Sequence, residues 1–404
     1  MPEAVIVSTA RSPIGRAVKG SLVDVRPDDL AATIVNAALE KVPALDRNLV
    51  EDLIMGSGQP GGEAGYNLGR MVAIMADMPN VPGVTVNRYC SSSLQTIRMA
   101  AHAIKAGEGD IFIAAGVETV SRYMNGAADT GPHNAKFGAA EARTVERTAG
   151  GQPSWAPGEG LPDAYIAMGQ TAENVAELKQ VSREDQDFFA AQSQQRATAS
   201  LENGFWEHEI TPIETVDAEG KPVTVKQDDG IRAGTTVEKL AGLQPAFKPN
   251  GTVTAGNACP LNDGAAAVIV MSDTKAKELG LTPLARIVAS GVTGLNPEIM
   301  GMGPVEACRQ AMGRAGMTID DIDLVEINEA FAAQVIPSAK YLGISWDKLN
   351  VNGGGIALGH PFGMTGARIM TTLINGLQDA DKTIGMESMC VGGGQGMAMI
   401  IERL

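Results

Sequence analysis

Aromatic residues are scarce in this chain, and so are cysteines and long apolar runs. Phe, Trp and Tyr together make up 4% of the 404 residues. The four cysteines form no CxxC pair, which excludes a zinc ribbon and argues against a disulfide framework. No uninterrupted apolar segment approaches the length needed to span a membrane. These absences favour a protein of a reducing compartment that is not inserted in a membrane.

Positive charge is also in short supply. The chain has 32 Lys and Arg residues against 47 Asp and Glu residues, for a formal net charge of −15. This balance argues against nucleic acid or an anionic membrane surface as the main partner. It leaves room for a small anionic ligand held by a local basic patch. The N-terminal stretch MPEAVIVSTARSPIG lacks the basic start and apolar run of a signal peptide, so we expect a cytoplasmic protein.

Glycine, by contrast, is abundant, with 48 residues in the chain. Hydrophobic residues make up 44% and charged residues 20%, as in ordinary globular proteins. A chain of this length exceeds one ordinary hydrophobic core, so we expect two or three domains. The glycine content indicates closely packed layers and backbone that closely approaches another group.

Strand-like and helix-like segments alternate in the first part of the chain. Apolar strands are predicted at 3–10, 50–57 and 110–118, and helices at 26–42 and 92–104. Such alternation predicts an α/β fold with a largely parallel sheet that helices cover on both faces.

After Ser121 this pattern breaks, and it returns only near residue 251. Residues 125–162 are rich in Gly, Pro and Ala without a clear period, and we predict a loop there. Residues 172–204 predict polar helices, and residues 209–229 predict a hairpin. An irregular insertion of this size inside a compact protein is usually functional.

A second α/β run begins near residue 264 and resembles the first. Each run has a switch from strand to helix that carries polar residues, Cys90 in the first and Asn328 with Glu329 in the second. We interpret this similarity as a weak internal duplication with an insertion in the first copy. Two such units packed together would place helices both outside and between the sheets.

Cys90 lies where a predicted strand becomes a helix, in the stretch VNRYCSSSLQTIRMAAHAI. Most free cysteines are small buried hydrophobes, and that interpretation stays open. The first N–H groups of a helix are unpaired and partly positive, so a thiol at this end is expected to have a lowered pKa. The second interpretation is therefore a reactive cysteine.

Three further positions combine polar side chains with glycine-rich surroundings. His360 stands between glycines and before a proline, although a loop residue capping a helix would also fit. Cys390 ends a predicted strand and precedes Gly392, and glycines there let backbone N–H groups point at a ligand oxygen. Asn328 lies at the second switch, where a simple helix N-cap is the alternative.

A cysteine with a histidine fits a hydrolase as well as an acyltransferase. A second cysteine at a strand end fits hydrolysis poorly. Two thiols suit a reaction that attacks a carbonyl and also moves a proton at carbon. By their local sequence, Cys259 and Cys308 are predicted to be packing thiols.

Six ordered motifs together resemble the thiolase family, and they span nearly the whole chain: NRYCSSSLQT, GVETVSR, GTVTAGNACPLNDGAAA, EINEAF, NGGGIALGHPFGMTGAR and CVGGGQGM. The resemblance implies a duplicated, five-layered αβαβα core with an inserted loop domain that binds CoA. The division it implies is an N-terminal half at 1–121 plus 252–275, a loop domain at 122–251, and a C-terminal half at 276–404.

The resemblance also implies catalytic roles. Cys90 is similar to the acylated nucleophile, and Cys390 to the thiol that acts as acid and base. His360 is similar to the group that activates Cys90 and, with Asn328 acting through a water, binds the thioester or ketone oxygen. The backbone N–H groups of Cys90 and Gly392 are similar to a second oxyanion hole.

Other positions match parts of the substrate path. Arg232 is similar to a residue at the adenine nucleotide end of CoA, and Met168 is similar to a residue lining the acyl pocket. The pantetheine channel is expected to include Phe247, Ala255 and Gly256. Two departures stand out: Cys259 occupies a position where relatives often have Ser, and Ala167 one where short-chain biosynthetic relatives often have His. The second departure favours a broader 3-ketoacyl-CoA thiolase.

The implied function is CoA-dependent thiolytic cleavage of 3-ketoacyl-CoA to acetyl-CoA and a shortened acyl-CoA, or the reverse condensation, through acyl-Cys90. CoA is expected as co-substrate, with no permanently bound cofactor and no metal. The alternatives are a condensing enzyme of the wider superfamily or a non-catalytic acyl-CoA-binding subunit. A homodimer is favoured over a homotetramer, because residues 127–157 do not resemble a tetramer-forming hairpin. The family also allows a hydratase–dehydrogenase partner subunit.

Overall fold

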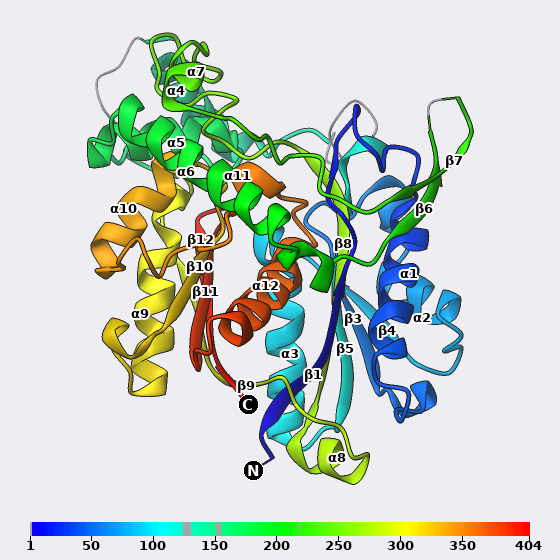
Figure 1. The fold of residues 1–404 in the computed structure, drawn as a ribbon. Helices are drawn as coiled ribbons and strands as arrows, with labels where there is room; N and C mark the ends of the chain where they lie inside the picture. The colour runs from blue at the N-terminus through cyan, green and yellow to red at the C-terminus, as the bar shows by residue number, and fades with distance from the viewer. Residues whose placement is uncertain (1, 124–130, 151–154, 218) are drawn as a thin grey trace.

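Two sheet regions with helices between and around them make up the core of the protein (Figure 1). The computed structural model describes residues 2–123, 131–150, 155–217 and 219–404. The main sheet follows the strand order β10-β11-β12-β9-β1-β8-β5-β3-β4, and β2 pairs with β8. Its strands are β1 (Ala4–Arg11), β2 (Gly15–Arg16), β3 (Asp52–Gly56), β4 (Gly83–Val86), β5 (Ile111–Thr119), β8 (Asn262–Ser272), β9 (Ala285–Gly294), β10 (Leu324–Ile327), β11 (Ile384–Val391) and β12 (Gln395–Arg403).

The sheet is mixed, so the prediction of a largely parallel sheet is wrong. In the first half β3, β4 and β5 run parallel, but β8 lies antiparallel to both β1 and β5. In the second half β10 and β11 are parallel, whereas β12 runs antiparallel to β11 and β9. The reason lies in the connections. A short glycine turn joins β11 to β12, and a turn that tight can link only antiparallel strands.

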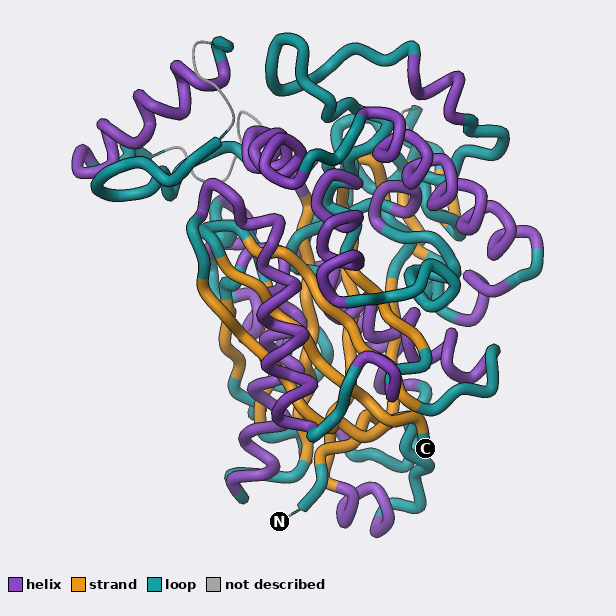
Figure 2. The backbone as a smooth tube through the Cα atoms, turned by 90° about the vertical axis from the view of Figure 1, so that its left-hand side faces the viewer, coloured by secondary structure: helices purple, strands orange, loops and turns teal. Residues whose placement is uncertain are grey.

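Helices lie both between and outside the two sheet regions, as the internal duplication predicts (Figure 1). The central pair is α3 (Ser92–Ala106) and α12 (Thr365–Asp379). On the outer faces lie α1 (Pro27–Glu40) and α2 (Leu68–Met75) in the first half, and α9 (Gly303–Ala315) and α10 (Ala332–Leu342) in the second. Figure 2 shows the core after a turn of 90°, with helix in front of the strands.

The central helices pack closely because small residues face each other. A Cβ on Gly366 of α12 would lie 2.3 Å from the backbone nitrogen of Leu94 in α3. Buried side chains at helical spacing on both helices, such as Ile97 and Ile369, join one hydrophobic cluster with residues of both sheet regions. The start of each central helix is thereby held at one end of the core.

The insertion between β5 and β8 contains both predicted and unpredicted elements. As predicted, it holds α5 (Met168–Lys179), α6 (Arg183–Glu202) and a hairpin of β6 (Ile213–Val216) and β7 (Pro222–Val225). The remaining short helices of the described chain include α7 (Val237–Ala241), α8 (Asp273–Glu278) and α11 (Gly355–Leu358).

The prediction of loop throughout residues 125–162 is wrong, because α4 spans Gly138–Thr148. The glycine and proline content of the whole window concealed a short stretch of good helix formers, GAAEARTVERT. Ala140, Thr144 and Arg147 of α4 are buried on one face. The predicted loop at 127–157 falls partly outside the described residues.

In the described part of the chain, no helix is long and apolar enough to cross a membrane.

Candidate active site

Cys90 lies at the predicted switch from strand to helix. Strand β4 ends at Val86, a short 3-10 turn covers Tyr89–Ser91, and α3 begins at Ser92. Tyr89 has a positive φ of 44°, which is unusual for a bulky side chain and indicates local strain. The turn leaves Cys90 only 7% exposed at the end of α3 that carries unpaired N–H groups.

The glycines after β11 bring a second backbone donor to this thiol. The backbone N–H of Gly392 forms a hydrogen bond that favours the thiolate of Cys90. Gly392 allows the approach because a Cβ there would lie 3.3 Å from the ring of Tyr89. Gly393 and Gly394 both have positive φ, which lets the chain turn sharply into β12.

The pKa of the Cys90 thiol is raised to about 11, mainly by burial and against the hydrogen bond from Gly392. The expectation of a lowered pKa is therefore wrong. Removal of the thiolate from water outweighs the modest stabilisation that a helix end offers. The thiol is protonated at neutral pH and needs a base to become a nucleophile.

His360 is held as a neutral base beside Asn328. Its Nδ1 lies 2.6 Å from Oγ1 of Thr365, and that hydroxyl donates to the carbonyl oxygen of Pro361 at 2.7 Å. The network therefore places the ring proton on Nδ1 and leaves Nε2, 3.2 Å from Nδ2 of Asn328, as the acceptor. Burial, helped by Arg368, lowers the pKa of His360 to about 3.

Asn328 is not a helix cap, since α10 begins at Ala332 with Phe331 as its N-cap. Its backbone N–H donates to the carbonyl oxygen of Ser388 in β11, which fixes the residue beside the strand that carries Cys390. The neighbouring Glu329 is buried and bonded to other groups, among them the hydroxyl of Ser193 at 2.6 Å. Asn328 thus faces the site, whereas Glu329 holds the surrounding loops.

Three of the four cysteines face one another. Burial raises the pKa of Cys390 well above its ordinary value, and the negative charges of ionised Cys90 and Cys259 raise it further. The pKa of Cys259 is raised by burial and then by Cys90. Cys259 and Cys390 also pack in one hydrophobic cluster. Cys259 is therefore part of the site, while Cys308 lies buried in α9 as predicted.

Sequence reasoning missed Glu118, a buried carboxylate behind the site. Its Oε2 accepts hydrogen bonds from the backbone N–H of Gly58 at 2.7 Å and of Gly363 at 2.8 Å, and Tyr123 donates to Oε1. It thereby ties the loop after β3 to the loop after His360. A charged residue at the end of the apolar run IFIAAGVE was the available signal.

The residues expected to bind CoA come together at one pocket of about 360 Å³. Five of them line it: Arg232, Phe247, Ala255, Gly256 and Cys259. Two cations that the sequence analysis missed, Arg16 and Lys19, lie on the same pocket. The site therefore has an apolar channel with positive charge along it.

Met168 lines a second pocket of about 280 Å³, together with Cys90 and Gly392. The two pockets adjoin, because the ring of Phe247 packs on Gly169, where a Cβ would lie 2.2 Å from it. Cys259 lines the first pocket, Cys90 lines the second, and Cys390 packs in one cluster with Cys259.

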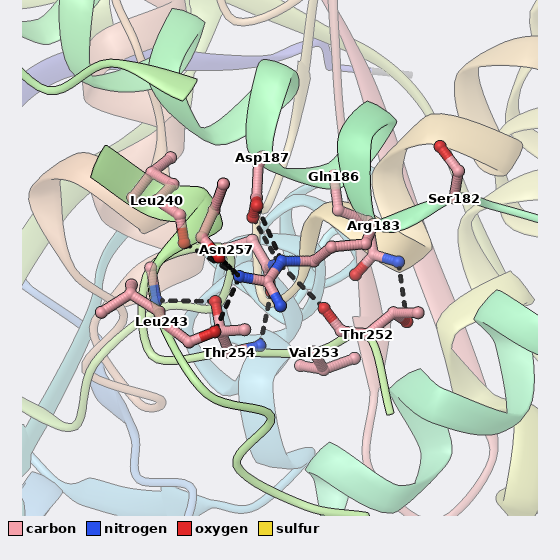
Figure 3. A network of polar contacts seen from close by, with 12 residues as sticks. Ser182, Arg183, Gln186, Asp187, Leu240, Leu243, Thr252, Val253, Thr254 and Asn257 are labelled. Atoms are coloured by element: carbon pink, nitrogen blue, oxygen red, sulfur yellow. Dashed lines mark hydrogen bonds and ion pairs between the residues drawn. The ribbon is translucent and has the colours of Figure 1, made fainter. Parts of the chain in front are cut away.

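A polar network fixes one wall of the first pocket (Figure 3). Arg183 of α6 pairs with Asp187 at 2.7 Å and donates to the carbonyl oxygens of Leu240 and Leu243. Asp187 in turn accepts from Nδ2 of Asn257 at 2.9 Å. The network joins α6 to the two chain segments that line the pocket.

Fold and site together indicate a class: an enzyme that transfers acyl groups. The thiol of Cys90 and the backbone N–H of Gly392 line the second pocket, the thiol of Cys390 lies close to Cys90, and the neutral imidazole of His360 packs against Phe362 of the same pocket. Groups of these kinds are suited to covalent catalysis with stabilisation of an oxyanion. In the described residues, no cluster of three or more His, Cys, Asp or Glu could hold a metal ion.

Comparison with known proteins places the chain more narrowly. Residues 4–274 match the model of the thiolase N-terminal domain, and residues 281–403 match that of the thiolase C-terminal domain. The 3-ketoacyl-CoA thiolases of Shewanella putrefaciens and Bacillus subtilis are each 44% identical to this chain, over 100% of both sequences. The chain belongs to the thiolase family, and it is an acyltransferase.

Solved structures agree with this assignment. The crystal structure of the Bacillus anthracis acetyl-CoA acetyltransferase matches with a TM-score of 0.88 at 39% identity. That of the human mitochondrial 3-ketoacyl-CoA thiolase matches with a TM-score of 0.86 at 36% identity. Each match covers 100% of this chain and 99% of the other. The protein therefore has the thiolase fold that the sequence motifs predict.

Proposed function

We propose that this protein cleaves 3-ketoacyl-CoA with free CoA, giving acetyl-CoA and a shortened acyl-CoA, and that it also runs the reverse condensation. The observation that carries the proposal is the proximity of the Cys90 and Cys390 thiols beside the second pocket, where a neutral His360 packs against Phe362. The 3-ketoacyl-CoA thiolases among its relatives support the broader substrate range over acetoacetyl-CoA alone.

In the first half-reaction, Nε2 of His360 takes the proton of Cys90, and the thiolate attacks the 3-keto carbon. The resulting oxyanion is stabilised by the backbone N–H groups of Cys90 and Gly392, the latter already directed at the sulfur. One such donor is worth about 3–4 kcal/mol in the transition state. The high pKa of Cys90 explains why the base is needed.

Breaking the carbon–carbon bond expels the carbanion of acetyl-CoA, which Cys390 protonates. The raised pKa of Cys390 keeps its thiol protonated for this step. His360, with Asn328 acting through a water, binds the thioester oxygen and stabilises the enolate. Free CoA then takes the acyl group from Cys90 in a ping-pong sequence.

The loop domain at 122–251 would supply much of the CoA site. The first pocket fits the pantetheine arm along Phe247, Ala255 and Gly256, and Arg232 suits the phosphates of the nucleotide end. We add Arg16 to that set because it lies on the same pocket. CoA is thus a co-substrate that enters and leaves, not a resident cofactor.

We also propose that two copies pair along β4, the last strand on its side of the sheet. An edge strand offers unpaired N–H and C=O groups, and apolar side chains around this edge are exposed, namely Tyr66, Met71, Ile74 and Val84. Light scattering should give twice 42.0 kDa for the wild type and a smaller mass for Val84→Lys.

A hydratase–dehydrogenase partner subunit stays an expectation from the family. The free cysteines support a reducing, cytoplasmic location.

The test is intact-mass spectrometry with peptide mapping after mixing with acetoacetyl-CoA. We expect an acetyl adduct on Cys90 that free CoA removes. Cys308→Ala is the matched control, because Cys308 lies apart in α9 and the variant should label like the wild type. No adduct, or an adduct on another cysteine, would favour the alternative of a non-catalytic acyl-CoA-binding subunit.

A further inference from the structure

The second pocket has an aromatic wall, which we define as Tyr89, His133, Tyr165 and Phe362. Aromatic residues are only 4% of the chain, and two of its five tyrosines stand here. Tyr89 and Tyr165 are 45% and 38% exposed, so part of each ring remains open to a ligand. Such a concentration of flat apolar surface beside a reactive thiol points to the shape of the group that the thiol receives.

The wall is built as a flat stack. The rings of His133 and Tyr165 lie 3.9 Å apart and are tilted by only 7°. Phe137 packs edge-on against Tyr165, with the ring centroids 5.3 Å apart. Tyr165 also accepts a hydrogen bond at its hydroxyl from the backbone N–H of Asn134. Contacts on several sides therefore fix the orientation of the Tyr165 ring.

A buried carboxylate anchors the segment that carries this stack. Glu298, in the second half of the chain, accepts hydrogen bonds from Nε1 of Trp155 at 2.6 Å and from the backbone N–H of Asp163 at 3.0 Å. It also pairs with Arg147 of α4 at 3.3 Å. The carboxylate side chain is only 2% exposed, so these bonds are shielded from water. The wall is thus tied to the core before any substrate binds.

Pocket size and wall shape favour one class of acyl group. A cavity of about 150 Å³ lined by apolar side chains holds benzene, so 280 Å³ has room for one ring and a short linker. A ring stacks on aromatic faces and has few bonds to immobilise. A straight chain of equal carbon number gains less from flat faces and loses more conformational freedom on binding.

We propose that this site prefers 3-ketoacyl-CoA substrates whose acyl group ends in a ring over straight-chain substrates with the same number of carbons. The proposal rests on the proposed thiolase reaction at Cys90. Tyr165 is the residue that sets the preference, because it presents the fixed ring of the aromatic wall. No covalent step beyond the proposed reaction is required.

The test compares 3-oxo-5-phenylpentanoyl-CoA with straight-chain 3-oxoundecanoyl-CoA, whose transferred acyl groups have equal carbon number. We expect kcat/KM of the wild-type protein to be about tenfold higher for the phenyl substrate. Tyr165→Ala should lower this ratio about fivefold, because an aromatic contact is lost. Tyr165→Phe should keep the ratio, because the ring remains. A ratio within one preparation cancels general losses of activity.

Tyr341→Ala is the matched control. Tyr341 is also a half-exposed tyrosine, but it lies on α10 and stacks with Lys179, so its removal should leave the ratio unchanged. A wild-type preference for the straight chain, or an unchanged ratio in Tyr165→Ala, would overturn the proposal. Absence of turnover with acetoacetyl-CoA would instead contradict the thiolase function, so the two failures are distinguishable.

Discussion

Individual residues in the site show how burial competes with local electrostatics. Cys90 stands at a helix N-terminus and receives a backbone hydrogen bond, yet burial raises its pKa to about 11. The pKa of His360 is instead lowered, to about 3, because burial disfavours its charged form. At neutral pH both groups are uncharged. In the proposed mechanism, proton transfer between them is therefore a part of catalysis and does not precede it.

The pH dependence of alkylation tests this balance. A raised pKa makes the thiolate fraction of Cys90 small at pH 7, and that fraction grows about tenfold for each pH unit below the pKa. The rate of iodoacetamide labelling at Cys90 should therefore climb without a plateau from pH 7 to about pH 10. Peptide mapping against Cys90→Ser isolates the site. A plateau near neutral pH would show a stabilised thiolate.

Thr365 is a positioning residue for His360. Thr365→Val removes the acceptor of the Nδ1 proton, so Nε2 loses its fixed role as acceptor. Loss of a hydrogen bond that orients an active-site group typically lowers activity about tenfold to a hundredfold. We expect a decrease of that size in the rate of Cys90 acylation. Rapid-quench kinetics would measure it, with Thr365→Ser expected to retain most of the rate. Equal rates in Thr365→Val and the wild type would exclude the role.

Substitution of Cys390 should affect the two half-reactions to different extents. In the proposed mechanism, Cys390→Ser weakens the acid that protonates the acetyl-CoA carbanion, but it leaves Cys90 and its donors in place. We expect cleavage of the carbon–carbon bond to slow far more than exchange of labelled CoA into acyl-CoA. Exchange requires only acylation and deacylation of Cys90. A loss of equal size in both assays would refute the division of labour.

At the scale of elements, the close contact of α3 and α12 sets where Cys90 and His360 lie. Gly366 is the contact point, since a Cβ there would be 2.3 Å from the backbone of α3. Backbone cannot rotate away as a side chain can, so the helices would have to separate. The same helix carries Thr365 at its first position. The packing of the two helices thus depends on one small residue, next to Thr365.

Glycine substitutions in two helices test this contact. Gly366→Ala should lower the free energy of unfolding by about 1–3 kcal/mol through overpacking. Gly313→Ala in α9 is the matched control, because no atom apart from its chain neighbours and its own helix backbone lies within 4 Å of its Cβ position. That variant should gain about 0.5–1 kcal/mol from helix propensity. Urea denaturation would measure both, and a neutral Gly366→Ala would show that the helices can move apart.

At the scale of the whole molecule, a buried ion cluster joins the insertion to the core. Arg11 of β1 pairs with Glu209 and Asp228, each at 2.8 Å, and all three side chains are fully buried. Asp228 also accepts from the backbone N–H of Ile14 at 2.7 Å. The first strand is thereby tied to both ends of the segment that contains β6 and β7.

Removing the cation should therefore destabilise the protein strongly. Arg11→Met leaves two carboxylates buried without their partner, which typically costs about 3–5 kcal/mol. Arg286→Met is the control, because its pair with Glu402 is 39% exposed at the arginine side chain and should cost less than about 1 kcal/mol. Thermal and urea unfolding would compare them. Similar losses in both variants would show that water reaches the Arg11 cluster.

The structure confirms the predicted hairpin, the helices between the sheets and the strand-to-helix switch at Cys90. It overturns the largely parallel sheet and the loop over α4. Short helices are lost when a long window is judged by its composition. Strand direction depends on which strands pair, and pairing between β8 and its neighbours joins residues over 140 positions apart.

The sequence by itself determined the family, the order of elements and the chemical groups of the site, because these are carried by local motifs. Only the tertiary structure decided the pKa of Cys90, the tautomer of His360, the roles of Glu118 and Thr365, and the aromatic wall. Each of these depends on burial or on contacts between distant segments. Burial and long-range contact are properties of the packed chain, and no short stretch of sequence contains them.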